Sequence, residues 1–149
     1  MRLVAFEPDI APNLGAMIRL AACFGMPLDV IEPCGFPFSV KALRRAAMDY
    51  ADLADICRHD SWDDYAGAPH AGRLVLLTTA GADPLWDFTF APEDRIMVGR
   101  ETAGVPPPVS GAADARLRIP MVPPARSMNV VTAAAIAVGE AVRQIGHTG

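Results

Sequence analysis

Two polar residues near the amino terminus stand in an otherwise apolar helical stretch and could bind an anion. Asn13 and Arg19 lie six residues apart, and Gly15 between them would let another chain or a ligand approach closely. A guanidinium is costly to bury without a partner. Arg19 is therefore expected either to pair with Glu7 or Asp9, or to clamp a phosphate or another anion. The residues alone leave both interpretations open.

A second candidate segment, 99–106, directly follows an apolar run. Gly99 and Gly104 bracket a charged turn in it. Such a loop can offer backbone N–H and C=O groups to a flat heterocycle without obstruction by side chains. Glu101, inside the turn, is either a surface charge or a group that orients a ligand.

The third candidate segment, 119–129, combines prolines with polar residues just before a long Ala-rich stretch. Ser127 is well placed as the cap of the following helix, which by itself would account for its presence. Asn129 could serve the same local purpose. Sequence reasoning therefore does not separate a capping role from a binding role here.

The rest of the chain must position these three segments. Short apolar runs predict strands at 2–6, 28–32, 54–58, 73–78, 95–99 and 116–119. Helical spacing predicts helices at 13–25, 39–48 and 127–145, begun by Asn13, Ser39 and Ser127, whereas 59–72 has the composition of polar turns. This alternation indicates an α/β fold with a mostly parallel sheet flanked by helices, in one domain over 1–149. Ligands bind outside the carboxyl ends of such strands, where the candidate loops lie, although ordinary turns would also explain these loops.

Composition and missing motifs exclude several classes of protein. The three cysteines form no CxxC pair and, with three histidines, show no zinc-ligand spacing, so no metal is expected. The chain has no GxGxxG, GxxxxGK[ST] or GxSxG motif, which argues against a dinucleotide site, a P-loop and a nucleophile elbow. The longest apolar run, 130–138, is far below the roughly 20 residues that span a bilayer. No signal peptide is evident, so a cytoplasmic protein with no membrane partner is expected.

The formal net charge of −4 argues at first against a nucleic-acid partner. The acidity is local, however: residues 49–101 carry four basic and eleven acidic side chains. Residues 1–48 carry five basic and four acidic side chains, and residues 102–149 carry four and two. The candidate segments at 13–19 and 119–129 therefore lie in mildly basic thirds of the chain.

In this order and spacing, the three segments resemble the three motifs of the SPOUT-class, S-adenosylmethionine-dependent RNA methyltransferases. Within that class, the chain is similar to the small tRNA (cytidine/uridine(34)-2′-O)-methyltransferases, which act on the wobble nucleotide. Further matching residues cover nearly the whole chain: Glu7-Pro8, Ile31-Glu32-Pro33, Leu43-Arg44-Arg45-Ala46, Asp49-Tyr50, Leu77-Thr78-Thr79 and Arg118-Ile119-Pro120-Met121.

The resemblance implies a carboxyl-terminal trefoil knot whose loops hold the cofactor, and a homodimer whose sites use residues of both subunits. Residues expected to line the S-adenosylmethionine pocket are Leu77, Thr78, Gly99, Gly104, Ile119, Ser127 and Met128. The Ala-rich last helix could permit close packing between subunits, although ordinary core packing explains it equally well.

The implied reaction transfers a methyl group from the sulfonium to the ribose 2′-oxygen of nucleotide 34 in the tRNA anticodon region, with leucine tRNAs as expected substrates. Arg19 matches the family's catalytic arginine. Since arginine keeps its proton in proteins, Arg19 is expected to hold the phosphate and stabilise the oxyanion, while phosphate or water accepts the proton. Orienting groups would be Asn13, Glu101, Ser127 and Asn129, and RNA contacts would come from Arg126, Arg44 and Arg45.

The sequence departs from the family pattern at two places, of which the first should leave the backbone loop usable and the second bears on the substrate. Arg100 stands where some relatives carry proline, and the sequence after Gly146 offers little of a basic tail that could grip an anticodon stem. Two alternatives therefore stay open. One is 2′-O-methylation of another tRNA or rRNA position, and the other is a non-catalytic RNA-binding module on the same fold.

Overall fold

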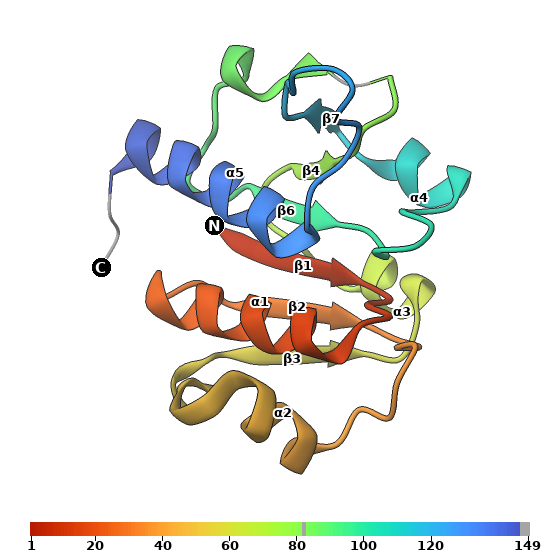
Figure 1. Cartoon of the computed structure of the whole chain (residues 1–149), viewed down its shortest axis with the longest axis vertical. Helices are drawn as coiled ribbons and strands as arrows, with labels where there is room; N and C mark the ends of the chain where they lie inside the picture. Colours follow the sequence, from red (N-terminus) through yellow and green to blue (C-terminus); the bar gives the residue numbers. More distant parts are fainter. Residues whose placement is uncertain (82, 147–149) are drawn as a thin grey trace.

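The computed structural model describes residues 1–81 and 83–146, with the side chains of Val40, Arg44, Ala46 and Ala51 outside that description. Within it, seven parallel strands form one sheet in the order β3-β2-β1-β6-β4-β7-β5 (Figure 1). The strands are β1 (Arg2–Phe6), β2 (Leu28–Ile31), β3 (Ile56–His59), β4 (Leu74–Leu77), β5 (Asp83–Pro84), β6 (Arg95–Val98) and β7 (Ala115–Arg118). The mostly parallel α/β sheet predicted from the sequence is confirmed.

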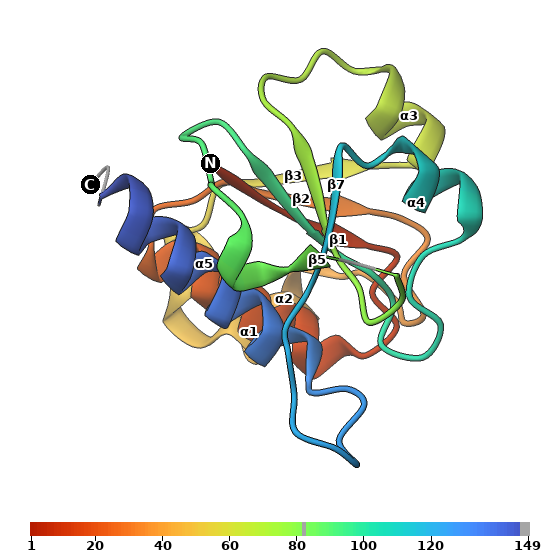
Figure 2. The same ribbon diagram turned by 90° about the horizontal axis from the view of Figure 1, so that it is seen from above.

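Helices cover both faces of the sheet. The helices are α1 (Ala11–Cys23), α2 (Val40–Ala47), α3 (Trp62–Gly67), α4 (Pro107–Ala112) and α5 (Val130–Ile145), with 3-10 turns η1 (Met48–Leu53) and η2 (Leu85–Asp87). Figure 2 shows α1, α2 and α5 on one face and α3 and α4 on the other. None of the helices in the described part of the chain has the length and apolar character needed to cross a membrane.

The central strands are apolar because both of their faces are covered. In β1, Leu3 packs in the cluster under α1 and α5, while its neighbour Val4 packs in the cluster under α3 and α4, and neither is exposed. A strand buried on both faces loses the alternation of polar and apolar residues. This is why the continuous apolar runs located six of the strands to within two residues.

The starts of two long helices differ from the prediction. The cap of α1 is Ile10, with Pro12 in the first turn, so Asn13 already lies inside the helix and its side chain does not cap it. The cap of α5 is Asn129, which accepts from the N–H groups of Val131 at 2.8 Å and Thr132 at 3.2 Å; the predicted cap Ser127 lies two residues before it. By contrast, Ser39 caps α2 as predicted, through Ala42 N–H at 3.1 Å.

Besides the 3-10 turns η1 and η2, two short α-helices and one short strand were not predicted. The segment 59–72, expected to be turns, contains α3, whose cap Ser61 accepts from Asp64 N–H at 3.1 Å. The Pro-rich stretch after the glycine loop contains α4, because proline is tolerated in the first turn of a helix. The short edge strand β5 pairs with β7. Each is six residues or shorter, so its periodicity gives little signal.

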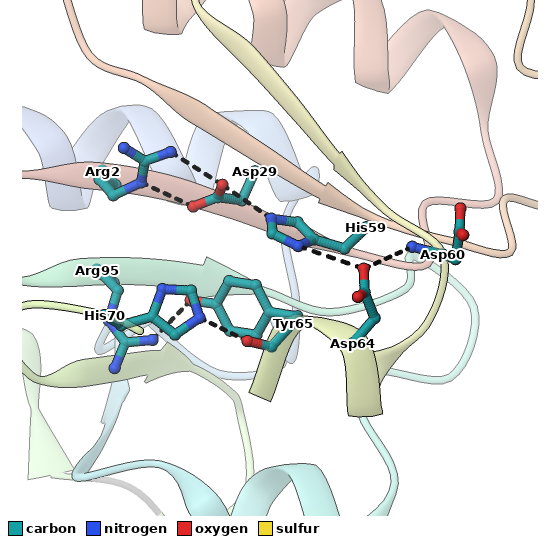
Figure 3. Close-up of polar contacts among 8 residues, drawn as sticks. All are labelled: Arg2, Asp29, His59, Asp60, Asp64, Tyr65, His70 and Arg95. Carbon is teal, nitrogen blue, oxygen red and sulfur yellow. Dashed lines mark hydrogen bonds and ion pairs between the residues drawn. The ribbon is translucent and has the colours of Figure 1, made fainter. Parts of the chain in front are cut away.

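Charged residues are buried where α3 packs on the sheet (Figure 3). Asp29 is 2% exposed and accepts two hydrogen bonds from Arg2, at 2.8 and 2.9 Å, and its Oδ1 lies 3.1 Å from His59 Nε2. Beside this row of hydrogen-bonded side chains, Arg95 donates to the hydroxyl of Tyr65 at 2.8 Å. Burial alone would raise the pKa of Asp29, but the hydrogen bonds from Arg2 and His59 outweigh it and lower that pKa.

Candidate active site

A cavity of about 1090 Å³ opens at the carboxyl ends of β4, β6 and β7. Its walls are the loops that follow these three strands, together with residues from α4 and from the starts of α1 and α5. The cavity therefore lies where ligands bind in open parallel sheets.

Every residue predicted to contact the cofactor lines this cavity: Leu77, Thr78, Gly99, Gly104, Ile119, Ser127 and Met128. They come from three loops that are distant in sequence. Of the residues predicted to act in catalysis, Asn13, Glu101, Ser127 and Asn129 also line it.

The loop after β6 is closed tightly on itself. Arg100 and Gly104 exchange backbone hydrogen bonds at 3.0 and 2.9 Å. A Cβ added to Gly99 would lie 2.6 Å from the carbonyl carbon of Gly104, and Gly104 itself has φ +62°. Both positions therefore favour glycine, and at these two positions the loop presents backbone to the cavity.

A chain of hydrogen bonds links the three candidate segments at one wall of the cavity. Asn129 Nδ2 donates to Asn13 Oδ1 at 3.0 Å, and Asn13 Nδ2 donates to Glu101 Oε1 at 3.2 Å. The start of α5, the first turn of α1 and the loop after β6 are thus tied together. Because Asn13 does not cap α1, both ends of its amide are used in this chain.

Asp9 supports this wall from outside the cavity lining, and sequence reasoning treated it only as a possible partner of Arg19. Its backbone N–H donates to Glu101 Oε2 at 3.0 Å, and Glu101 N–H donates to Asp9 Oδ1 at 3.1 Å. The hydroxyl of Thr102 donates to Asp9 Oδ2. Asp9 follows the end of β1, at the same sheet edge as the loop after β6, and this placement is the signal that could have identified it.

Burial, followed by the neighbouring Asp9, raises the pKa of Glu101. The pKa of Asp9 is lowered, first by its contact with the side chain of Glu101 and then by donors from the loop. The pKa values of these two neighbouring carboxyl groups therefore shift in opposite directions. The group with the raised pKa, Glu101, is the one that lines the cavity.

Arg19 lies outside the cavity of its own chain. Its guanidinium is exposed, 4.8 Å from the centre of the Tyr50 ring and 3.7 Å from the sulfur of Met48. The ion pairs considered for it from sequence are not the ones formed: Glu7 pairs with Arg100 at 3.3 Å, and Asp9 holds the loop after β6.

The remaining basic candidates are also outside the cavity lining. Arg126 and Arg45 are exposed, and the side chain of Arg44 lies outside the described residues. Sequence reasoning did not assign two arginines that do line the cavity. These are Arg100 and Arg116. The Nη1 atom of Arg116 donates to the carbonyl oxygens of Ser110 at 2.7 Å and Ala113 at 3.1 Å.

One group of potential metal ligands comes together in the described part of the chain, formed by Asp29, Cys57 and His59. The carboxylate of Asp29 is already occupied by Arg2 and His59, and a guanidinium at this distance opposes a cation. None of the three residues lines the cavity.

Comparisons with known proteins agree with this geometry. The model of the SpoU rRNA Methylase family matches residues 1–139. A tRNA (cytidine(34)-2′-O)-methyltransferase from Beijerinckia indica is 50% identical over 146 residues, which are 97% of this chain and 91% of that protein.

Two solved structures share the fold. One, described as giving structural insights into the 2-OH methylation of C/U34 on tRNA, has a TM-score of 0.90 and 35% identity, covering 97% of this chain and 95% of that one. The other, an AdoMet-bound rRNA methyltransferase from Sinorhizobium meliloti, has a TM-score of 0.85 and 26% identity, covering 97% of this chain and 56% of that one. From its cavity, its sheet order and these matches, this chain belongs to the SpoU rRNA methylase family of methyltransferases.

Proposed function

We propose that this protein transfers a methyl group from S-adenosylmethionine to the ribose 2′-oxygen of nucleotide 34, a cytidine or uridine, in tRNA. One observation carries the proposal. The seven residues expected to contact the cofactor line one cavity, and its wall carries the hydrogen-bonded chain Asn129–Asn13–Glu101. The relative from Beijerinckia indica, which matches over nearly the whole chain, supports the same substrate.

The cavity fits S-adenosylmethionine in size and lining. About 1090 Å³ lies just above the roughly 300–1,000 Å³ found for small-molecule sites, which leaves room for part of a target nucleotide as well. The backbone of the 99–104 loop suits an adenine ring, and Leu77 and Ile119 supply apolar walls. When bound, the cofactor supplies an electrophilic methyl group on a sulfonium.

In this reaction the protein's residues must bind the ribose and stabilise the charge that develops on its oxygen. Asn13, Asn129 and Ser127 orient the ribose from the wall that they share with Glu101. Arg19 holds the neighbouring phosphate and stabilises the emerging oxyanion, because a guanidinium keeps its charge and donates in a planar fork.

The position of Arg19 favours a homodimer. Since Arg19 lies outside the cavity of its own chain, we propose that Arg19 of the partner subunit reaches this cavity. Helices α1 and α5 lie side by side on one face (Figures 1 and 2). The exposed residues Ala16, Ala135 and Gly139 on these helices allow a second copy to approach closely.

The substrate contacts follow the same proposal. Arg126 and Arg45 are exposed, and with Arg44 they would bind phosphates of the anticodon region, with leucine tRNAs as the expected substrates. A single domain over 1–149 and a cytoplasmic location remain predictions from the sequence itself. A knot in the carboxyl-terminal part remains a prediction from the resemblance.

The test is methyl transfer from labelled S-adenosylmethionine to tRNA from cells that lack ribose methylation at nucleotide 34. We expect label in the tRNA and, after digestion, in the 2′-O-methyl group of nucleotide 34. Label at another position would identify a different RNA site. No label, despite measurable cofactor binding, would favour a non-catalytic RNA-binding module.

A further inference from the structure

Methyl transfer to a hydroxyl releases one proton that the site must remove, and the cavity lining indicates which group accepts it. We propose that Glu101, held in place by Asp9, accepts the proton of the ribose 2′-hydroxyl. The proposal rests on the proposed function and replaces phosphate or water as the proton acceptor. Glu101 would then be a catalytic residue and Asp9 a positioning residue.

The composition of the cavity lining is the first argument. Among the described residues that line the cavity, Glu101 is the only one that carries a carboxylate, an imidazole or a thiol. The other polar groups at its wall are amides and hydroxyls, and Arg100 and Arg116 are permanently protonated. No other lining side chain in the described part of the chain can take up a proton near neutral pH.

The geometry of Glu101 suits this role. Its Oε1 accepts from Asn13 Nδ2 at 3.2 Å and its Oε2 from Asp9 N–H at 3.0 Å. An ionised carboxylate offers about four acceptor positions, so these two contacts orient the group and leave capacity for a substrate hydroxyl. Because Asn13 also contacts Asn129, the ribose-orienting groups and the proton acceptor share one wall.

Asp9 holds Glu101 from outside the cavity. Its two carboxylate oxygens accept from the Glu101 N–H and from the Thr102 hydroxyl, so it binds the loop on both sides of the Glu101 side chain. A Cβ added to Gly35 would lie 2.7 Å from the Cβ of Asp9, which shows how closely the chain packs behind it. Asp9 is therefore a fixed support for Glu101.

The step balances without a further reactant. The 2′-oxygen forms a bond to the methyl carbon, and the carbon–sulfur bond breaks with its electron pair left on sulfur, which loses its positive charge. The hydroxyl proton moves to the Glu101 carboxylate, which becomes a neutral carboxylic acid. That acid then releases its proton to water after the products leave.

The electrostatics around Glu101 agree with a base. Burial and the neighbouring Asp9 raise the pKa of Glu101, and a higher pKa makes a carboxylate a stronger proton acceptor. The other charged groups nearby are Glu7 and Arg100, which pair with each other at 3.3 Å. Burial raises the pKa of the Cys34 thiol to about 11, so this thiol stays neutral.

The experiment measures single-turnover methyl transfer between pH 5 and 8, with enzyme saturated by S-adenosylmethionine. For the wild-type enzyme we expect a rate that rises with pH and then levels off. Glu101→Gln should lose about 100-fold or more in rate, the usual contribution of a general base, and should lose the rise with pH. Asp9→Asn should keep the rise but move it to lower pH, because the side-chain contact with Asp9, after burial, raises the pKa of Glu101.

Two controls separate chemistry from folding. Binding of S-adenosylhomocysteine, measured by calorimetry, should change no more than a few-fold in Glu101→Gln and Asp9→Asn. Glu93→Gln alters an exposed glutamate outside the cavity lining and should keep the wild-type rate and pH profile.

The possible outcomes distinguish this proposal from the proposed function. A Glu101→Gln enzyme that keeps the wild-type rise with pH would overturn Glu101 as the acceptor. An Asp9→Asn enzyme that is slower at every pH, with the rise unshifted, would overturn the electrostatic role of Asp9. If wild-type enzyme binds S-adenosylhomocysteine but methylates no tRNA, the proposed function itself fails.

Discussion

Asn129 donates from its side-chain nitrogen to the side-chain oxygen of Asn13 across 3.0 Å, although 116 residues separate them in the chain. The same Asn129 caps α5 through the N–H groups of Val131 and Thr132. One amide thus fixes the start of the last helix and also orients a residue of the first. A substitution at Asn129 should therefore affect both stability and activity, through separable contacts.

Two variants of Asn129 separate these roles. Asn129→Asp keeps an oxygen for the cap but lacks the N–H group that binds Asn13, whereas Asn129→Ala loses both contacts. We expect Asn129→Ala to lower the free energy of unfolding by about 1 kcal/mol, the usual value of a helix cap, and Asn129→Asp to change it little. Both should slow methyl transfer. Denaturant unfolding and initial rates measure the two effects, and full activity of Asn129→Asp would show that its contact with Asn13 is not needed.

The location of Arg19 predicts complementation between subunits. Arg19→Ala should bind S-adenosylhomocysteine normally and lose about 100-fold or more in methyl transfer, as for loss of a group that stabilises an oxyanion. When it is mixed with Glu101→Gln under conditions that exchange subunits, part of the activity should return. In such a heterodimer, one site would combine an intact Glu101 with the partner subunit's Arg19.

The same mixture also tests the opposite arrangement. If Arg19 acted in the cavity of its own chain, both sites of the heterodimer would lack one group and no activity would return. Mixing Arg19→Ala with Arg19→Lys, which both alter the same position, provides the control for nonspecific recovery.

The buried Asp29 predicts a pH dependence of stability. Its pKa is lowered in the folded protein by Arg2 and His59, against the effect of burial, so it stabilises the fold fully above its unfolded pKa of about 4. This contribution is lost as the pH falls below about 4, towards the folded pKa. Asp29→Asn should therefore flatten the fall in unfolding free energy over this window, as measured by urea denaturation. An unchanged slope would contradict the prediction.

Removal of Arg2 tests the same network from its other end. Arg2→Ala leaves Asp29 buried with one partner fewer and should lower the free energy of unfolding by about 2 kcal/mol. This is less than the roughly 3–5 kcal/mol lost when a fully buried pair is broken, because Arg2 is partly exposed. Arg143→Ala removes an exposed ion pair with Glu140 and should leave the unfolding midpoint unchanged.

The closed loop after β6 predicts a strong effect of one methyl group. Gly99→Ala would place a Cβ 2.6 Å from the backbone of Gly104, so the loop must shift and the affinity for S-adenosylhomocysteine should fall at least tenfold. Gly67→Ala is the matched control, because no atom lies within 4 Å of its added Cβ. Calorimetric titration measures both variants, and normal affinity of Gly99→Ala would show that the loop tolerates the shift.

Much of the fold could be predicted because the central strands are buried on both faces and read as continuous apolar runs. The short helix α3 could not, since its six residues carry only one buried side chain, Tyr65, and no period. The choice between Ser127 and Asn129 as the cap of α5 was also open, because both residue types cap well. The cap is the residue at which the chain enters the helix, and the position of that residue depends on tertiary contacts.

The cofactor cavity could be predicted from glycine and proline loops after strands, together with the family resemblance. The contact of Asp9 with Glu101 could not, because the two residues are 92 positions apart and meet only when β1 and β6 pair. The exposure of Arg19 could not be predicted from the sequence either. Its apolar neighbours in sequence face the core, whereas Arg19 itself points away from it.

The most direct test of the account uses two tRNA transcripts that differ in a single atom. One carries a ribose at nucleotide 34 and the other a 2′-deoxyribose there, and both are incubated with the wild-type protein and labelled S-adenosylmethionine. The account predicts one methyl group in the first transcript, on the 2′-oxygen of nucleotide 34, and none in the second. Equal labelling of both transcripts, or no labelling of either by protein that binds the cofactor, would contradict it.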